Sequence, residues 1–467
     1  MCLFALAAFF SVTILALRYW ILPNIDDYRL EIAQIISKRA EQLVSIDRIN
    51  AHWNGVHPYL QLHGVKVYDQ AGTPALILTE VEGTLSWHSI LHQELRFREI
   101  KIDRPTLIMR RDAHNVIHIA GTNISDEKND TENSFIDWLL RQEKLVINQT
   151  DIYWLDEYRN APALYLKIVN LLLHSHNLTN RHQLGLRVAA LDSTAMSMDI
   201  RGDFTGKSIE SFLHWQGRLY FELKQIDLAV WRQWIPFPDE IDVRHGKGAL
   251  RGWLTLAEGT ITDWLIDTAL HQISANLGTN LPKLELDFLQ GRIDVKQSNQ
   301  SGSLVQEWTA HQLNFKLAHQ QIITNPINAI WRQYHDPKRS ESSNYLQIDE
   351  IDVGVWANLL EYLPVDASVR KQVEKYSPHG KIERMQLSWK GSWSEPHAYQ
   401  LDTQFNNLSL NNIQIGHLIS IHGLSGNIQG TEQEGRLNLN SQSVSLQLRQ
   451  PFPQSIVFDT LATTVGW

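Results

Sequence analysis

The feature that most constrains the fold is a two-residue period of apolar and polar side chains, which recurs from Val44 to the end of the chain. Successive side chains of a β-strand point to opposite faces, so this period gives each strand one dry and one wet face. Such strands are typical of antiparallel sheets, because the strands of parallel α/β enzymes are apolar on both faces. The sequence therefore predicts a mainly β protein with a largely antiparallel sheet. Its clearest apolar positions are Leu60, Leu62, Leu95, Phe97, Ile100, Ile102, Leu437, Leu439, Leu446 and Leu448.

Turn signals separate the strands about every ten to fifteen residues. The clearest are Asp69–Gly72, Arg104–Pro105, Asp112–Asn115, Asn276–Gly278 and Gly430–Gly435. This spacing predicts roughly twenty to twenty-five strands, which at about 4.8 Å each would give a sheet on the order of 100 Å long.

The chain also repeats itself over a long interval. Short motifs recur in the same order: Ile226–Trp231 and Ile351–Trp356, His245–Lys247 and His379–Lys381, Asp267–Thr268 and Asp402–Thr403, and Leu289–Gly291 and Leu424–Gly426. Repeated strand units predict a sheet that grows by the addition of strands. We therefore expect two consecutive sheet segments, residues 45–235 and residues 236–467.

The start of the chain predicts a membrane anchor. Residues Met1 to Leu17 carry no charged side chain, and Arg18, Tyr19 and Trp20 follow. A helix extended to residue 22 approaches the ~30 Å of a hydrocarbon core, with the aromatic pair at the interface. A cleaved signal peptide is the alternative, but the segment has neither a basic start nor a small-x-small cleavage site. We expect an uncleaved anchor over residues 1–22, with Leu3, Phe4, Leu6, Phe9, Phe10, Ile14, Leu17, Tyr19 and Trp20 as its anchoring residues.

Residues 23–44 have the three- and four-residue spacing of an amphipathic helix. Asn24 or Asp26 would cap it. We expect the helix to pack its apolar side on the sheet. A helix on a membrane surface is the alternative, but such helices favour a basic polar face, and this one carries charges of both signs. The apolar positions are Ile25, Tyr28, Leu30, Ile32, Ile35, Ile36 and Leu43.

Motifs in the first 160 residues resemble one family. Trp53–Leu62 is similar to the W-x-G-x-x-P-x-L-x-L opening of the AsmA-like proteins, particularly of the YhdP type. The family's later motifs follow in order, in Val81–Ile90, in Ile100–Leu107 with Arg111–Asp112, and in Phe135–Gln142 with Trp154–Asp156. Beyond residue 160 the chain resembles the family only in its general sequence pattern, and no further motif is matched. Family members are usually much longer, so the chain resembles an N-terminal portion.

The resemblance implies a Gram-negative envelope protein with one span in the inner membrane and its bulk in the periplasm. Its relatives are bridge-like lipid transport proteins, in which a long, curled, largely antiparallel sheet with a few short helices forms an elongated apolar groove. It implies a carrier that shields phospholipid acyl chains and supports their transport to the outer membrane and its permeability barrier. The implied partners are acyl chains, the inner membrane and envelope proteins at the distal end. Acyl chains suit such strands, which then need no second layer. We therefore expect the groove to be lined by Leu60, Leu62, Leu95, Phe97, Ile100, Ile102, Leu437, Leu439, Leu446 and Leu448.

Composition disfavours two other classes of function. The net charge of -9 and the sequence pI of about 6.1 argue against a general nucleic-acid binder. The single cysteine, Cys2, excludes an intrachain disulfide and a multi-cysteine metal site. No Gly-rich phosphate loop occurs in the sequence.

Side chains that could carry chemistry have simpler interpretations. The pairs His174 and His176, and His114 and His118, lack a third metal ligand, so we expect exposed histidines. Gly423–Gly426 lacks the spacing of a nucleophile elbow and is predicted to be a turn. The acidic run Ser125–Ser134 is predicted to be a solvated loop. We therefore expect no enzymatic activity, no cofactor and no metal.

Sixteen tryptophans are many for this length. Trp87, Trp154, Trp231 and Trp356 lie near predicted strand ends or helix starts. We expect packing at sheet edges, with lipid contact as the alternative role.

Two further classes of function compete with the lipid carrier. A membrane-anchored periplasmic hydrolase would need a convergent polar site, and the sequence shows none. An outer-membrane protein assembly factor or envelope structural factor would use the sheet edge without lipid transfer. Lipid that co-purifies with the protein would favour the carrier over both.

We expect the mature protein to retain residues Leu3 to Leu22, because this segment lacks a cleavage site and ends in an aromatic pair. Mass spectrometry of protein isolated from membranes tests this. A mature N-terminus near Pro23 would contradict the uncleaved anchor.

Overall fold

The computed structural model describes residues 12, 14–40, 43–68, 72, 74–89, 95–119, 122–123, 135–176, 178–191, 197–207, 214–234, 240–300, 303–318, 324–335, 342–391, 396–413, 417–449 and 454–467. These residues form a mainly β structure with few helices. The described helical elements are η1 (Leu17–Ile21), η2 (Leu22–Tyr28), α2 (Arg29–Ala40), α4 (Phe135–Leu140), α5 (Leu228–Trp231), α6 (Val353–Leu360) and α7 (Ala367–Tyr376).

The first thirteen described strands are β1 (Val44–Ser45), β2 (Arg48–Asn54), β3 (His57–Tyr68), β4 (Pro74–Leu85), β5 (Phe97–Asp103), β6 (Thr106–Arg111), β7 (Ile117–Ile119), β8 (Thr122–Asn123), β9 (Lys144–Asp156), β10 (Ala161–His176), β11 (Arg181–Leu191), β12 (Met198–Thr205) and β13 (Gln216–Asp227). The strands that follow are β14 (Asp242–Ala257), β15 (Thr260–Asn276), β16 (Leu284–Gln300), β17 (Ser303–Leu317), β18 (Ile327–His335), β19 (Ser342–Ile348), β20 (Ile351–Asp352), β21 (His379–Gly391), β22 (Pro396–Leu410), β23 (Leu418–Thr431), β24 (Gly435–Leu448) and β25 (Ile456–Gly466).

The chain divides into two compact units. Unit 1 comprises Met1–Gln225 and Trp253–Ile261, and unit 2 comprises Ile226–Gly252 and Thr262–Trp467. The boundary predicted between residues 235 and 236 stays a prediction, since residues 235–239 lie outside the described part of the chain.

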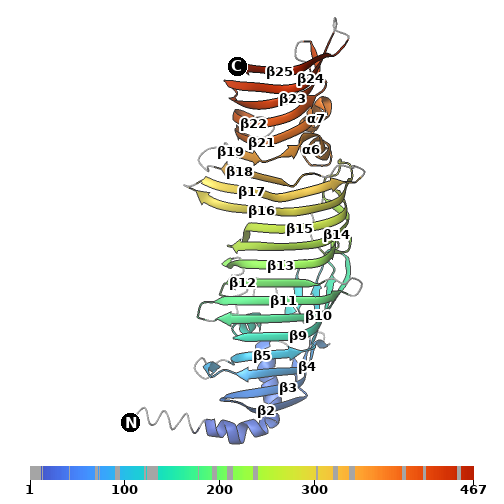
Figure 1. Ribbon diagram of the computed structural model, residues 1–467. Helices are drawn as coiled ribbons and strands as arrows, with labels where there is room; N and C mark the ends of the chain where they lie inside the picture. The colour runs from blue at the N-terminus through green and yellow to red at the C-terminus, as the bar shows by residue number, and fades with distance from the viewer. Residues whose placement is uncertain are drawn as a thin grey trace, which may run out of the picture. The chain divides into compact units, whose positions relative to one another are not determined.

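In unit 1, antiparallel pairing runs from strand to neighbouring strand through β2, β3, β4 and β5, and again from β9 to β13 (Figure 1). Strand β9 joins the two runs by parallel pairing, with β5 before residue 149 and with β6 after it. Gln149 has φ 53, and such a left-handed residue bends a strand where its partner changes. The sheet of unit 1 is thus largely antiparallel with one bend in β9.

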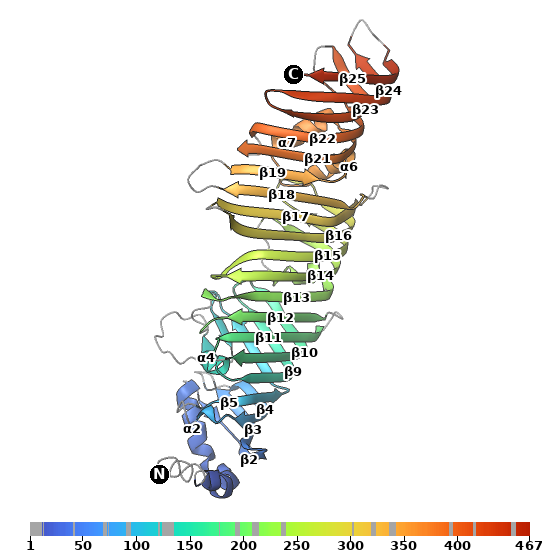
Figure 2. The same cartoon turned by 60° about the vertical axis from the view of Figure 1, so that its left-hand side comes forward.

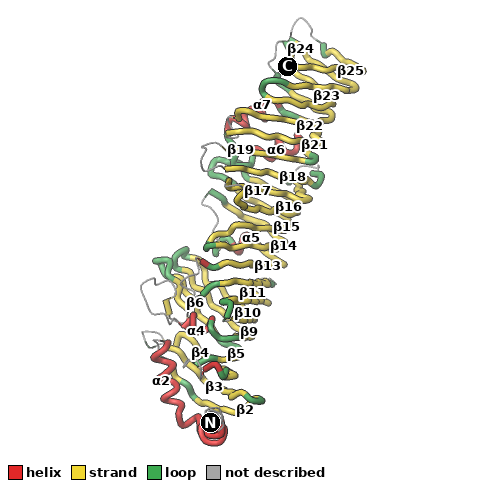
Figure 3. The backbone as a smooth tube through the Cα atoms, turned by 90° about the vertical axis from the view of Figure 1, so that its left-hand side faces the viewer, coloured by secondary structure: helices red, strands yellow, loops and turns green. Residues whose placement is uncertain are grey.

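The predicted amphipathic helix is present as η2 and α2, and one side of it packs on the sheet of unit 1. Ile25, Ile32 and Ile36 contact a cluster that includes Ile49 and Val65, and α2 lies alongside β3 and β4 (Figure 3). The remaining predicted apolar positions, Tyr28, Leu30, Ile35 and Leu43, are exposed.

The predicted helix caps are wrong. Asn24 has non-helical dihedral angles, and its side chain donates to the Trp20 carbonyl at 3.0 Å. The Asp26 carboxylate accepts the Ile49 backbone N–H at 2.8 Å, so it joins the helical segment to β2. A side chain with a tertiary partner of this kind does not cap its own helix.

A second helix fixes the start of β5. The amide of Gln142, which is 1% exposed, accepts the Phe97 backbone N–H at 2.8 Å and donates to the Trp138 carbonyl. Trp138, on α4, donates from Nε1 to the Leu95 carbonyl at 2.9 Å and lies edge-on to the Phe97 ring. Figure 2 shows α4 beside β9. The helix is therefore held to the sheet by both polar and aromatic contacts.

In unit 2, antiparallel neighbours follow from β15 through β19, and from β21 through β25. Left-handed residues let the strands bend without turning their buried side outward. In β24, exposed Gln442 and Ser443 lie between buried Ser441 and Val444, and Ser443 has φ 56. Leu437 and Leu439 therefore share one face with Leu446 and Leu448 across the bend.

The repeated motif at residues 226–231 and 351–356 has one structural explanation. In both copies the aspartate is the N-cap of a short helix: Asp227 accepts the Ala229 N–H at 3.0 Å, and Asp352 accepts the Val355 N–H at 3.2 Å. The lysines of the second repeated motif have different partners: Lys247 lies 3.7 Å from the N-cap Asp227, and Lys381 lies 3.5 Å from Glu350.

One predicted turn is wrong. Gly423–Gly426 lies inside β23, and Gly423 has φ 83. Both Gly and Ser residues are common in turns, so a bulge within a long strand is easily taken for a turn in sequence.

Replacement of Gln142 by Ala should lower the free energy of unfolding of unit 1 by about 1–3 kcal/mol, because it leaves the buried Phe97 N–H without an acceptor. Urea unfolding of the chain, followed by tryptophan fluorescence, tests this. Gln225→Ala, at an exposed position, is the matched control. Equal midpoints for the two variants would contradict the proposed role of Gln142.

Candidate lipid-binding faces

Two rows of apolar side chains cross the sheet of unit 1 on one face. Side chains paired across neighbouring strands point to the same side, so the register defines each row. The first row is Leu62, Val81, Ile102, Ile147, Leu171, Leu186, Ile200 and Phe221. The second is Leu60, Gly83, Ile100, Leu145, Leu173, Leu184, Gly202 and Leu219. We call these two rows apolar face 1.

Protein covers apolar face 1 only in part. At its first strands α2 packs near Leu62 and Val81, and Trp138 and Leu139 of α4 pack on Ile100. On β11, β12 and β13, Leu184, Leu186, Ile200, Leu219 and Phe221 stay partly exposed. An apolar row that remains partly open in a folded sheet is a candidate site for an apolar ligand.

Phenylalanine rings fill the two glycine positions of the second row. A Cβ at Gly83 would lie 2.6 Å from the Phe97 ring, and a Cβ at Gly202 would lie 2.2 Å from the Phe204 ring. At these glycines an aromatic ring therefore lies directly against the backbone, which keeps the row continuous.

The opposite face of unit 1 is charged. Lys101 pairs with Asp103 at 2.7 Å, Arg201 with Asp199 at 2.9 Å and Arg181 with Asp203 at 2.5 Å. Hydrogen bonds from these cations lower the pKa of each aspartate. A pocket of about 240 Å³ on this face is lined by Arg201, Asp203, Arg218, Tyr220 and Trp253, among others.

Unit 2 has a corresponding face with three rows. The aliphatic row is Ile266, Ile293, Ala310, Ala329, Ile348, Met385, Thr403, Ile428, Leu437 and Val465, in which Thr403 is a polar member that donates to the Arg384 carbonyl. The tryptophan row beside it is Trp264, Val295, Trp308, Trp331, Leu346, Leu387 and Leu401. The amide row beyond it is Gln297, Gln306, Gln333 and Asn344. The aliphatic and tryptophan rows are apolar face 2.

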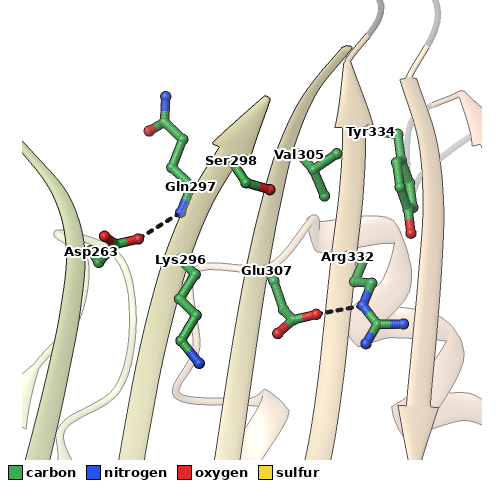
Figure 4. A pocket seen from close by; sticks show the side chains of 8 residues that line it. All are labelled: Asp263, Lys296, Gln297, Ser298, Val305, Glu307, Arg332 and Tyr334. Atoms are coloured by element: carbon green, nitrogen blue, oxygen red, sulfur yellow. Dashed lines mark hydrogen bonds and ion pairs between the residues drawn. The ribbon is translucent and has the colours of Figure 1, made fainter. Parts of the chain in front are cut away.

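The opposite face of unit 2 is again charged. Arg332 pairs with Glu307 at 2.5 Å, and Asp267 accepts from Arg292 and Arg251, each at 2.6 Å. The hydrogen bond from Arg292 lowers the pKa of Asp267. A pocket of about 530 Å³ on this side is lined largely by such side chains, including Lys296 and Tyr334 (Figure 4). Its balanced charges make it a poor site for an acyl chain.

Most predicted groove residues lie on these two faces. Leu60, Leu62, Ile100 and Ile102 belong to apolar face 1, and Leu437 to apolar face 2. Leu439 is two residues further along the same strand, and Leu446 pairs with Ile421 and Ile456. Leu448 pairs with Leu418. Whether these side chains contact lipid stays a prediction.

Two predicted groove residues have additional or different surroundings. Phe97 is buried beside Trp138 and Gly83, so its ring packs against protein. Leu95 precedes β5 and is 44% exposed, so it is not part of the row. Sequence reasoning missed the rows on β10 to β13, although Leu184 and Leu186 alternate with polar neighbours in the same way.

Of the predicted anchor, Leu3, Phe4, Leu6, Phe9 and Phe10 lie outside the described residues. Ile14 and Leu17 are partly exposed, and Tyr19 and Trp20 are 71% and 68% exposed. Among the described helices, none combines the length and the apolar composition that a membrane crossing requires.

The histidines and Ser425 do not form a catalytic cluster in the described structure. His174 and His176 lie side by side with ring centroids 4.5 Å apart, and His118 lies 3.0 Å from Asp112. The Ser425 hydroxyl donates to Asn406 and accepts the Asn407 N–H, each at 3.0 Å. Of the residues described, no three His, Cys, Asp or Glu side chains are grouped so as to hold a metal. The acidic run at residues 125–134 lies outside them.

The structure brings together side chains from separate motifs of the sequence. The ring centroids of Trp53, in the first motif, and Trp87, in the second, lie 6.2 Å apart. Arg111 forms a two-pronged ion pair with Asp156, which is almost fully buried, and the Arg111 guanidinium lies over the Trp154 ring. These residues are 45 positions apart in the chain, so alternation alone could not reveal the pair.

These features define a class of protein: a mainly β chain whose sheets separate an apolar face from a charged face. The model of the YhdP protein family matches residues 1–467, so the chain belongs to that family. The resemblance seen in the sequence motifs is thereby confirmed.

One curated relative is the intermembrane phospholipid transporter YhdP of Escherichia coli (strain K12), which is 23% identical over 279 residues. The match covers 55% of this chain and 20% of the relative, so the chain aligns with about a fifth of that protein's length. No solved structure matches the chain.

Proposed function

We propose that the chain is part of an envelope lipid carrier that shields phospholipid acyl chains on apolar faces 1 and 2. The observation that carries the proposal is the pair of apolar rows on β10 to β13, whose side chains stay partly exposed while the opposite face holds ion pairs. The name of the Escherichia coli relative, an intermembrane phospholipid transporter, supports the same class of ligand.

The proposed location is the inner membrane, with a single span in residues 1–22 and the sheets in the periplasm. Transport toward the outer membrane would follow a gradient of lipid or depend on a partner, since the sequence has no phosphate loop. Apart from acyl chains and the inner membrane, the proposed partners are envelope proteins at the far end. We propose no catalytic step and no cofactor.

Photo-crosslinking in cells tests the ligand. A photoreactive residue at Leu186 should capture phospholipid, because this side chain lies in the apolar row and is partly exposed. A residue at Arg187, on the charged face of the same strand, should not. Phe97 is a poorer probe because Trp138 packs on it.

The outcome also decides between the carrier and the assembly factor. Capture of protein strands without lipid at either position would favour a factor that acts through its sheet edge. Lipid captured equally at both positions would contradict a one-sided apolar face.

Replacement of Leu439 by Asp should block lipid passage with only a mild loss of stability. A carboxylate beside acyl chains costs several kcal/mol, whereas the partly exposed side chain should cost the fold less than about 2 kcal/mol. Outer-membrane permeability in cells and urea unfolding of the purified variant are the two measurements.

Asn438→Asp is the matched control, because Asn438 faces the other side and its side-chain oxygen accepts from Thr464 at 2.9 Å, as a carboxylate also can. If Leu439→Asp unfolds the chain instead, this part of the face is ordinary core, and the carrier mechanism fails for it.

A further inference from the structure

On β16, β17 and β18 of unit 2, the polarity of the side chains decreases stepwise over three neighbouring rows. Of the three, the amide row lies nearest the strand ends, one row inside Asn299, Leu304 and His335. The tryptophan row comes next and the aliphatic row follows. Successive rows on one face are two residues apart along each strand, or about 7 Å. Within about 14 Å the face thus changes from hydrogen-bonding to aromatic to purely aliphatic.

The amide row differs from an ordinary solvated rim. Its four members, Gln297, Gln306, Gln333 and Asn344, are uncharged carboxamides on four neighbouring strands. The opposite face of the same strands carries Lys296, Glu307 and Arg332 instead. A rim selected only for solubility would carry such charges on both faces.

The amides of this row are available to a ligand. Gln306 and Gln333 are partly exposed, and in the described part of the chain their side chains make no hydrogen bond to protein. Asn344 is the exception, since it is buried and donates to the Gly391 carbonyl at 3.2 Å. Each free carboxamide offers both a donor and an acceptor to a polar group.

The tryptophans form a connected aromatic strip. The ring centroids of Trp308 and Trp264 lie 5.6 Å apart, with the rings edge to face. Those of Trp308 and Trp331 lie 6.3 Å apart, with the rings stacked. Trp331 is 37% exposed. Indole rings favour the boundary between hydrocarbon and polar groups, which is where they gather in membrane proteins.

The order of the rows matches the order of groups in a phospholipid at a bilayer surface, namely head group, ester region and acyl chains. We propose that unit 2 holds diacyl glycerophospholipids in a fixed register. The phosphate and head group lie at Gln306 and Gln333, the glycerol and ester groups at Trp308 and Trp331, and the acyl chains on Ala310 and Ala329. This proposal rests on the proposed function and adds the orientation of the lipid and the residues that set it.

Site-mapped labelling with two photoreactive phospholipids tests the register. The full chain is reconstituted in vesicles of phosphatidylethanolamine and phosphatidylglycerol that contain a trace of phospholipid with a diazirine either in the head group or near the end of an acyl chain. After irradiation, mass spectrometry locates the labelled residues. The head-group probe should label the amide row several-fold more than the aliphatic row, and the acyl probe the reverse.

A double variant, Gln306→Leu with Gln333→Leu, should reduce labelling of this region by the head-group probe several-fold and leave acyl labelling unchanged. Gln386→Leu with Gln400→Leu makes the same chemical change on the charged face and should alter neither signal. Gln306→Asn with Gln333→Asn keeps the carboxamides and should retain head-group labelling even if the leucine variant folds poorly.

The outcomes separate this inference from the proposed function. Acyl labelling of the aliphatic row together with head-group labelling spread evenly over all three rows overturns the register and leaves the carrier intact. An absence of labelling by both probes overturns the carrier and the register together.

Discussion

The structure depends on one constraint: the long strands of both units present rows of apolar side chains to one side, and that side must be kept from water. Burial of apolar area contributes about 25 cal/mol per Å², so an uncovered sheet face is costly. In unit 1 the first strands meet this constraint with protein, because α2 packs on Ile49 and Val65 and α4 packs on Ile100. On β11 to β13 the same rows stay partly exposed. A ligand with long apolar chains would cover these rows from water, as the helices cover the first strands.

The charged faces contribute to specificity more than to stability. Exposed ion pairs such as Arg181–Asp203 contribute little to the stability of a sheet of this extent, because water and salt screen them. Their effect on register is larger, because a slip by one residue would turn every charged side chain of a strand to the apolar side. The left-handed residues also keep each side chain on its own face. Ser443, for example, allows β24 to bend while Ser441 and Val444 both stay buried.

A feature of the fold could be predicted from the sequence where residues close together in the chain determine it, and not where distant residues do. The two-residue period is local, so it predicts the antiparallel strands and places Leu60, Leu62, Ile100 and Ile102 on one face. The helix caps depend on tertiary partners, such as Ile49 for Asp26, and were predicted wrongly. The apolar side of the helix was predicted in part, since Ile25, Ile32 and Ile36 contact the sheet and the other named positions are exposed. The Arg111–Asp156 pair joins β6 to β9 through parallel pairing, which no local pattern encodes. The graded rows of unit 2 require the cross-strand register, so single strands gave no sign of them.

Because neighbouring strands repeat the same rows, a lipid bound within one unit would meet similar contacts on each strand. A methylene group transferred to water costs about 0.8 kcal/mol, so an acyl chain of about sixteen carbons would lose on the order of 12 kcal/mol. On a face whose neighbouring strands repeat the same row, a step of about 4.8 Å replaces each apolar contact by a similar one. Leu171, Leu186 and Ile200 are such successive positions in unit 1, as are Ile293, Ala310 and Ala329 in unit 2. The free energy of a bound chain would therefore change little from strand to strand, and a modest difference in lipid supply would suffice to give its movement a direction.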